Sequence, residues 1–183
     1  MPNYLRNYLP GGTYFFTVVT QDRRQILTAP SSRELLRTAI QDELARAPFT
    51  QVAIVLLSEH LHTIWTLPEG DADYSIRWKR IKERFTRRFL AQGGEEAATT
   101  NNRKKHQERG VWQPRFWEHT ITDDDDFERC LNYIHYNPVK HGLVQRVCDY
   151  PWSTFHDHVK LGVYSLDWGC GPAPLEVDGA EWD

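Results

Sequence analysis

A short apolar run followed at once by a second strand-like segment sets the strongest limit on how this chain folds. Residues 52–57 form the longest uninterrupted apolar run, and residues 60–67 continue with further β-branched and aromatic side chains. Only Ser58 and Glu59 separate the two segments. Such residues favour strands, and strands joined by two residues form a hairpin. The sequence therefore predicts an antiparallel hairpin, with one strand over residues 49–57 and the next over 60–67.

Two histidines stand at the start of the second of these strands, in the order His60-Leu61-His62. Side chains alternate between the two faces of a strand, so His60 and His62 point the same way and Leu61 points into the core. Two imidazoles on one face lie close enough together to hold one metal ion. The plainer alternative is that both histidines belong to the solvent-exposed face of an antiparallel strand.

A second informative stretch, residues 132–138, closes a predicted helix over residues 125–136. Helical spacing places Tyr133 and Asn137 one turn apart on the same face. We expect Asn137-Pro138 to end the helix, because a residue before proline is disfavoured in the helical region. The side chain of Asn137 then departs from ideal helix geometry.

The same helix carries a second tyrosine, Tyr136. At roughly 100° per residue, Tyr133 lies on the flank of the apolar stripe and Tyr136 lies nearly opposite it. The stripe is formed by Phe127, Leu131 and Ile134. The flank can face the edge of a sheet that carries His60 and His62. Considered alone, Tyr133 is equally compatible with an ordinary packed tyrosine.

Together these features resemble the REP-associated tyrosine transposases, relatives of insertion-sequence transposases within the HUH endonuclease superfamily. His60-Leu61-His62 matches the histidine–hydrophobic–histidine motif, Tyr133 resembles the single nucleophilic tyrosine, and Asn137 matches the third metal ligand. The other matching segments are residues 11–18, 65–71, 112–119 and 137–142. They occur in order and with similar spacing from about residue 4 to about residue 168.

The resemblance implies an α+β fold, with an antiparallel sheet of the ferredoxin-like or RRM-like HUH type and helices packed on one face. It also implies a metal-dependent endonuclease and strand-transferase that acts on single-stranded DNA beside short palindromic REP hairpins. Tyr133 would form a 5′-phosphotyrosine and release a 3′-hydroxyl. His60, His62 and Asn137 would hold Mg²⁺ or Mn²⁺.

Two other functions remain open at this stage. One is a non-catalytic, RRM-like module that binds single-stranded nucleic acid through its sheet. The other is a metal phosphoesterase that activates water and forms no covalent intermediate.

Charge is distributed unevenly, although the net charge of the chain is only −3. The predicted helix over residues 74–90 carries seven basic residues and one acid between positions 77 and 88. Such an element suggests a localised polyanion site, while a solvated helix face is the ordinary alternative. The residues expected to contact DNA are Arg77, Lys79, Arg80, Lys82, Arg84 and Arg87 from this helix, with Arg115 and His119 from a strand face.

The remaining predicted elements complete a strand–helix–strand–strand–helix–strand–helix order. They are a strand over 13–20, a helix from Ser31 or Ser32 to 47, a strand over 111–120, and a short helix over 155–161. Pro114 favours an edge or irregular position for the strand that contains it. We expect one domain over residues 1–168, a flexible loop over 92–110 and an acidic tail over 169–183.

Composition fits a globular protein, with 40% hydrophobic and 13% aromatic residues. The longest apolar run is far too short to span a membrane, and the first residues lack the apolar core of a signal peptide. We therefore expect an intracellular protein. The resemblance implies a cytoplasmic protein associated with the bacterial nucleoid, and we expect a monomer or homodimer. Three widely spaced cysteines, Cys130, Cys148 and Cys170, are expected to be free thiols.

Overall fold

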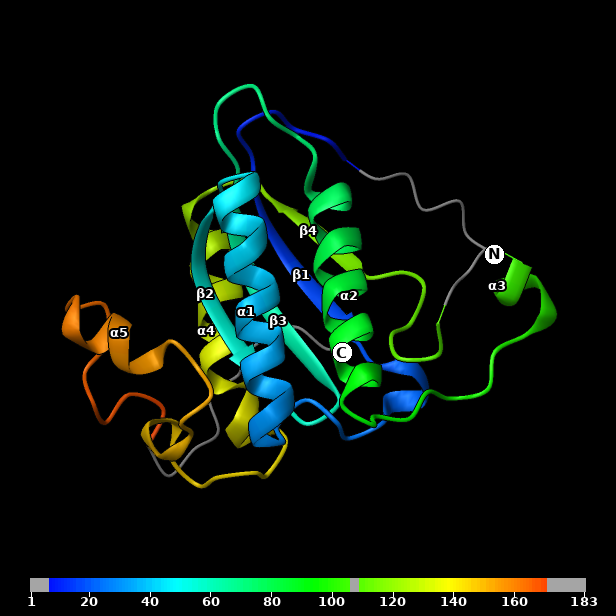
Figure 1. Ribbon diagram of the computed structural model, residues 1–183. Coiled ribbons are helices and arrows are strands. Elements are labelled where there is room, and N and C mark those ends of the chain that lie inside the picture. The colour runs from blue at the N-terminus through cyan, green and yellow to red at the C-terminus, as the bar shows by residue number, and fades with distance from the viewer. Residues whose placement is uncertain (1–6, 106–108, 171–183) are drawn as a thin grey trace.

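The computed structural model describes residues 7–105 and 109–170. Its helices and strands follow the predicted order, and a short helix interrupts the expected loop (Figure 1). The strands are β1 (Thr13–Val19), β2 (Thr50–Leu56), β3 (His60–Thr66) and β4 (Trp117–Ile121). The helices are η1 (Gln21–Arg23), α1 (Pro30–Arg46), α2 (Tyr74–Ala91), α3 (Asn101–Lys105), α4 (Asp124–Lys140), η2 (Val147–Asp149) and α5 (Phe155–Lys160).

The four strands form one antiparallel sheet in the order β2-β3-β1-β4. The β1-α1-β2-β3-α2-β4 connection with this order is the ferredoxin-like arrangement. The predicted hairpin is β2-β3, and β1 lies beside β3 with Thr17 opposite His62. The α+β class and the antiparallel sheet expected from the sequence are therefore confirmed.

The helices cover both faces of the sheet, whereas the sequence predicted helices on one face. α1 and α2 lie side by side in front of the sheet and α4 lies behind it (Figure 1). Along β3, Leu61 packs with α1 and α2 and Ile64 packs with α4. The alternation of β3 thus supplies two apolar clusters, because both of its faces are buried. The predicted core position of Leu61 is confirmed.

The last long helix, α4, runs three residues beyond Asn137 and contains Pro138, so the predicted end at Asn137-Pro138 is wrong. The proline lacks only one N–H donor, and the next backbone bonds reform: His141 N–H donates to the carbonyl of Asn137 at 3.0 Å. The helix ends instead at Lys140, and Gly142, two residues later, has a φ of 67°, the left-handed conformation that favours glycine. Asn137 therefore keeps helical register with Tyr133.

β4 is shorter than predicted, beginning at Trp117 and not at residue 111. Pro114 cannot donate to a ladder, so the preceding segment is irregular. Trp112 makes one isolated bridge with Thr20, and Gln113 N–H donates to Val19. β4 is an edge strand, as Pro114 suggested.

The expected flexible loop over residues 92–110 contains α3 and several specific hydrogen bonds in its described part. Ala97 N–H donates to the carbonyl of Gly110 at 2.8 Å. Arg24 Nη1 donates to the carbonyl of Glu95 at 2.7 Å. Polar contacts of this kind produce no periodic pattern of apolar residues. The sequence therefore predicted a flexible loop where the structure has ordered contacts. Residues 106–108 lie outside the described part, as does the predicted tail beyond Cys170.

The segment after α4 packs back on the sheet edge and on α4. Thr154 N–H donates to the carbonyl of Ile54 in β2 at 3.0 Å, and Phe155 joins the cluster beneath α4. The three cysteines are free, as predicted. Within residues 7–105 and 109–170, no helix combines the length and the hydropathy needed to cross a membrane.

Candidate active site

The predicted histidine pair is buried between the sheet and α4, not placed on a solvent-exposed face. His60 and His62 are 1% and 0% exposed. Their Nε2 atoms face each other at 3.1 Å. Two nitrogens bound to one divalent ion at right angles, each at about 2.1 Å, would be about 3.0 Å apart. The spacing therefore suits two ligands of a single ion.

The second nitrogen of each imidazole lies against a neighbouring oxygen. His62 Nδ1 is 2.8 Å from Thr17 Oγ1 in β1, and His60 Nδ1 is 3.1 Å from Glu59 Oε1. Burial lowers the pKa of His60, against the opposing effect of the Glu59 carboxylate. Burial thus favours the neutral imidazole that binds metals. Outer contacts of this kind fix the ring orientation and leave Nε2 to bind.

Two side chains of α4, and a third from the residue that follows it, are spaced one helical turn apart on the side of this pair. The Tyr133 ring meets the His62 ring edge-on, with centroids 5.2 Å apart. The His141 ring lies 5.6 Å from the His60 ring. Asn137 is four residues from both Tyr133 and His141, so all three share one helix face. Asn137 is therefore positioned between the two contacts, above the pair of imidazoles.

Asn137 is a buried polar residue without the hydrogen bonds that such residues normally make. It is 0% exposed, and within the described part of the chain neither its Nδ2 nor its Oδ1 has a hydrogen-bond partner. Leaving a buried amide unpaired costs about 1–3 kcal/mol, so such groups are rare without a role. A divalent ion accepts an amide oxygen as a ligand. Two imidazoles and this amide therefore fit a metal site.

The two tyrosines of α4 occupy different surroundings. Tyr133 is 1% exposed and also meets the Phe15 ring edge-on, with centroids 5.9 Å apart. Tyr136 contacts Trp168 of the C-terminal segment, with centroids 6.3 Å apart. Tyr133 thus faces the histidine pair, and its edge-on contact with His62 agrees with the flank position predicted for it.

Three of the basic residues expected to contact DNA hold α2 in place instead. Arg77 is 2% exposed and binds the Asp71 carboxylate at 2.6 and 3.0 Å, so in this structure its charge is directed at the Asp71 turn and not at the surface. Arg80 and Arg84 donate to the two oxygens of Glu43, a fully buried residue of α1, at 3.2 and 2.5 Å. A charge run in a sequence does not reveal these acidic partners.

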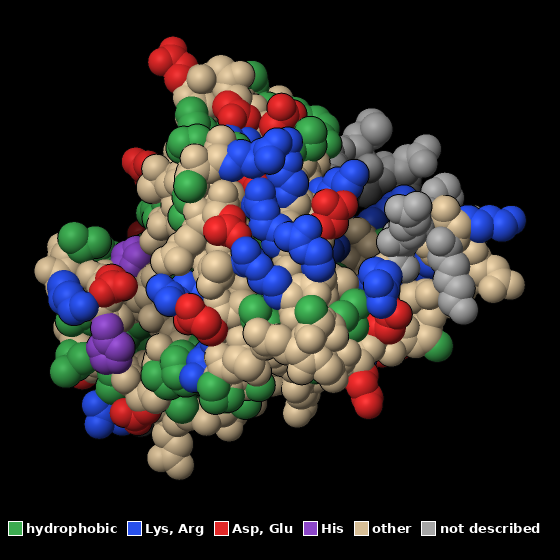
Figure 2. Space-filling view, viewed as in Figure 1, with side chains coloured by type: hydrophobic (Ala, Val, Ile, Leu, Met, Phe, Trp, Pro, Cys, Tyr) green, Lys and Arg blue, Asp and Glu red, His purple; other side chains and the backbone are tan. Residues whose placement is uncertain are grey.

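Three further basic residues of α2 face a groove. Lys79, Lys82 and Arg87 line it from α2, opposite Trp112 and Phe116. Basic side chains gather in a band along α2, with acidic ones among them (Figure 2). Lys82 Nζ donates to the carbonyl of Gln113 at 2.5 Å, which joins α2 to the opposite wall.

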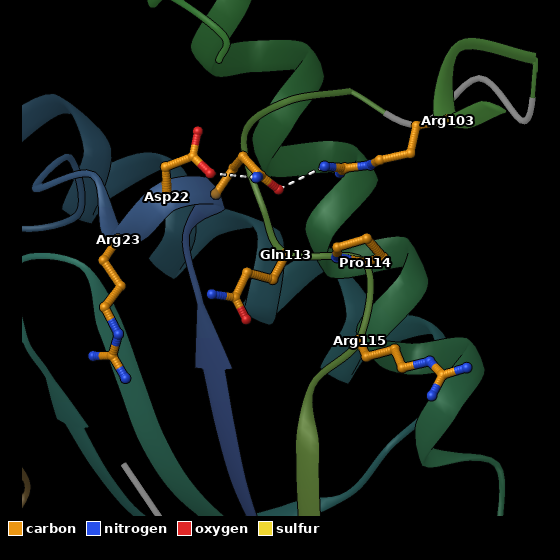
Figure 3. Close-up of a pocket in the computed structure, with 7 residues that line it drawn as sticks. Asp22, Arg23, Arg103, Gln113, Pro114 and Arg115 are labelled. Atoms are coloured by element: carbon orange, nitrogen blue, oxygen red, sulfur yellow. Dashed lines mark hydrogen bonds between the residues drawn. The ribbon is translucent and has the colours of Figure 1, made fainter. Parts of the chain in front are cut away.

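A second depression of about 600 Å³ lies between η1 and the segment before β4 (Figure 3). Three arginines from separate segments line it: Arg23, Arg103 and Arg115. Arg103 Nη1 donates to Gln21 Oε1 at 2.6 Å. Arg23 has a left-handed φ of 49° and lies 3.9 Å from Glu59, the carboxylate beside His60. This depression therefore approaches the histidine pair.

His119 belongs to a separate group of potential ligands with Asp126 and Cys130, whose donor atoms lie within 4.8 Å of one another. These groups are compatible with a metal ion, but they are already engaged. His119 Nε2 lies 2.8 Å from Asp126, which also accepts the N–H of Thr122 at 3.0 Å. Burial raises the pKa of the Cys130 thiol to about 12, so it is not a ready thiolate ligand.

Sequence reasoning missed Thr17, Glu59, Lys140 and His141, all of which contact the candidate site. His141 is the one that spacing could have found, because it lies four residues after Asn137. The predicted helix end at Pro138 concealed it. Thr17 reaches His62 through strand pairing, which no local pattern specifies, whereas Glu59 directly precedes His60 in the sequence.

Similar proteins of known sequence and of known structure belong to one family. No family model matches the chain. It is 46% identical over 169 residues to the REP-associated tyrosine transposase of Escherichia coli (strain K12), covering 92% of this chain and 91% of that protein. A Haemophilus influenzae protein described by the same family name is 45% identical over 179 residues, covering 98% and 99%.

A solved structure of a REP-associated tyrosine transposase bound to a REP hairpin has a TM-score of 0.78 with this chain. The two are 42% identical, and the match covers 97% of this chain and 96% of that one. Both the sequence relatives and the solved structure span nearly the whole chain. The chain therefore belongs to the REP-associated tyrosine transposases, a family of DNA transposases.

Proposed function

We propose that this chain is a metal-dependent endonuclease and strand-transferase for single-stranded DNA, with Tyr133 as its nucleophile. The observation that carries the proposal is the edge-on contact between Tyr133 and His62, with the unpaired amide of Asn137 one turn away. The hairpin-bound relative supports a substrate beside REP-type palindromic hairpins. Such a substrate places the proposed site of action in the bacterial cytoplasm, at the nucleoid.

In the proposed reaction, Tyr133 Oη forms a bond to phosphorus as the bond from phosphorus to the 3′ oxygen breaks. The phenolic proton leaves and the 3′ oxygen gains a proton, giving a 5′-phosphotyrosine and a 3′-hydroxyl. Because one phosphodiester replaces another, a second 3′-hydroxyl can reverse the step and join strands. When held by His60, His62 and Asn137, Mg²⁺ or Mn²⁺ would polarise the scissile phosphate.

The proposed DNA path combines the two basic depressions. Lys79, Lys82 and Arg87 would contact phosphates in the groove along α2, where Trp112 and Phe116 offer aromatic surfaces. Arg115 would contact the strand from the depression that approaches the histidine pair. We propose that His119 also contacts the DNA, because a third of its side chain is exposed beside Asp126.

The test uses an oligonucleotide with a REP-type hairpin and a single-stranded flank, incubated with Mn²⁺ or Mg²⁺ and resolved under denaturing conditions. The proposal predicts one fragment with a polymerase-extendable 3′-hydroxyl and the other fragment bound to protein. Release of a free 5′-phosphate fragment without a protein adduct would instead indicate a phosphoesterase. Tight binding with intact DNA would indicate a non-catalytic binding module.

A further inference from the structure

Lys140 contacts the atom that the proposed reaction uses. It lies in the last turn of α4, seven residues after Tyr133 and hence two turns along the same side of the helix. Its Nζ donates to Tyr133 Oη at 3.3 Å and lies 4.7 Å from the centroid of the tyrosine ring. The contact depends on the continuation of the helix through Pro138.

The hydrogen bonds that end α4 fix the backbone position of Lys140. Gly142 N–H donates to the carbonyl of Val139 at 2.9 Å, and Leu143 N–H donates to the carbonyl of Pro138 at 2.9 Å. These bonds close the helix directly after Lys140, with Gly142 in the left-handed conformation. The backbone of Lys140 is therefore held, and its ammonium group starts from a defined position beside the phenol.

A tyrosine hydroxyl is a poor nucleophile near neutral pH, because its ordinary pKa is about 10. A cation that donates a hydrogen bond to the phenolic oxygen stabilises the charge that develops as the proton leaves. This effect is larger where water is scarce, and Tyr133 is 1% exposed. An ammonium group next to the oxygen is thus suited to the chemical step and not only to packing.

We infer that Lys140 is a catalytic residue whose ammonium group stabilises the phenolate character of Tyr133 Oη in the transition state; this rests on the proposed function. During cleavage the Oη–phosphorus bond forms and the phosphorus–O3′ bond breaks. The phenolic proton passes to solvent, the 3′ oxygen takes a proton from solvent, and Lys140 remains an ammonium throughout. In strand joining the same phenolate is the leaving group, so Lys140 acts in both directions.

The test compares Lys140→Met, which removes the charge, with Lys140→Arg, which keeps it. Lys160→Met is the matched control, since Lys160 is 75% exposed and pairs with Asp157 on α5. Single-turnover adduct formation is measured at saturating DNA, together with DNA affinity and melting temperature. We expect Lys140→Met to lower the rate by at least about 100-fold at unchanged affinity and melting temperature. Lys140→Arg should recover most of the rate and Lys160→Met should match wild type.

A second substrate separates the nucleophile from the leaving group. With sulfur in place of the bridging 3′ oxygen, the leaving group needs no proton, and the Lys140→Met defect should persist. Rescue by this substrate would overturn the inference by placing Lys140 on the leaving oxygen. A Lys140→Met rate within about threefold of wild type, or a defect confined to DNA affinity, would also overturn it. If wild type forms no adduct, the proposed function itself fails.

Discussion

Tyr133 and His62 meet edge-on, with ring centroids 5.2 Å apart and planes inclined at 77°. One belongs to α4 and the other to β3, so the contact joins the helix to the face of the sheet on which His60 and His62 lie. Tyr133 is buried in this interface and also contacts Lys140. The proposed nucleophile and the two histidine ligands thus lie on separate elements, and packing of α4 on the sheet brings them together, with Asn137 on the same helix as Tyr133.

The first prediction concerns the histidine pair. Mn²⁺ should raise the melting temperature of wild type, because a ligand that binds only the folded state stabilises it. His60→Ala and His62→Ala should remove this rise and abolish cleavage, while circular dichroism in chelator still reports a folded chain. A folded double alanine variant that cleaves fully in chelator would refute the metal requirement.

The second prediction concerns the unpaired amide of Asn137. Asn137→Leu replaces it with an apolar side chain of similar size, so the free energy of unfolding in chelator should rise by about 1–2 kcal/mol. The same substitution should abolish metal-dependent stabilisation and cleavage. Urea unfolding with and without Mn²⁺ measures both effects. Loss of stability in chelator would show that the amide has structural partners in the folded chain.

The third prediction separates two arginines of α2. Arg84→Ala should destabilise the fold by about 3–5 kcal/mol, because it leaves the buried Glu43 carboxylate less well paired. Arg87→Ala should leave stability within about 0.5 kcal/mol and weaken DNA binding, with a salt slope reduced by about one. Urea unfolding measures the change in stability, and DNA-binding titrations at several salt concentrations measure the change in salt slope. The reverse pattern would contradict the division of α2 into structural and DNA-facing sides.

The fourth prediction is a pH dependence at the start of α4. Burial raises the pKa of Asp126, but hydrogen bonds from His119 and Thr122 lower it more, so its pKa lies below the ordinary 3.8. The carboxylate therefore stabilises the fold above that value and loses this contribution as the pH falls through its folded pKa. Asp126→Asn should cost about 1–3 kcal/mol at pH 7. The difference from wild type should shrink toward pH 3, and a constant difference across this range would refute it.

Local patterns in the sequence predicted the parts of the site that lie within single elements. The alternation of β3 placed His60 and His62 on one face and Leu61 on the other, and helical spacing placed Asn137 beside Tyr133. The end of α4 was mispredicted, because a preference against helix before proline is weaker than three further backbone hydrogen bonds. That error hid Lys140 and His141.

Long-range contacts were beyond local reasoning. Thr17 supports His62 only because β1 pairs with β3 in one register. The sequence alone does not show that Arg77, Arg80 and Arg84 are paired. In the fold, Asp71 pairs with Arg77, and Glu43 of α1 pairs with Arg80 and Arg84. The position of α4 behind the sheet is also a long-range feature. Side chains on the two faces of β3 belong to two separate apolar clusters, and α4 covers the second of them.

The central claim is that Tyr133 carries the DNA. An oligonucleotide labelled on the 3′ side of the nick should yield labelled protein of higher mass, and peptide mass spectrometry should place the nucleotide on Tyr133. Tyr133→Phe should abolish the adduct while DNA binding is retained, and Tyr136→Phe should retain the adduct because Tyr136 faces Trp168. Modification of Tyr136, or an adduct formed by Tyr133→Phe, would contradict the assignment.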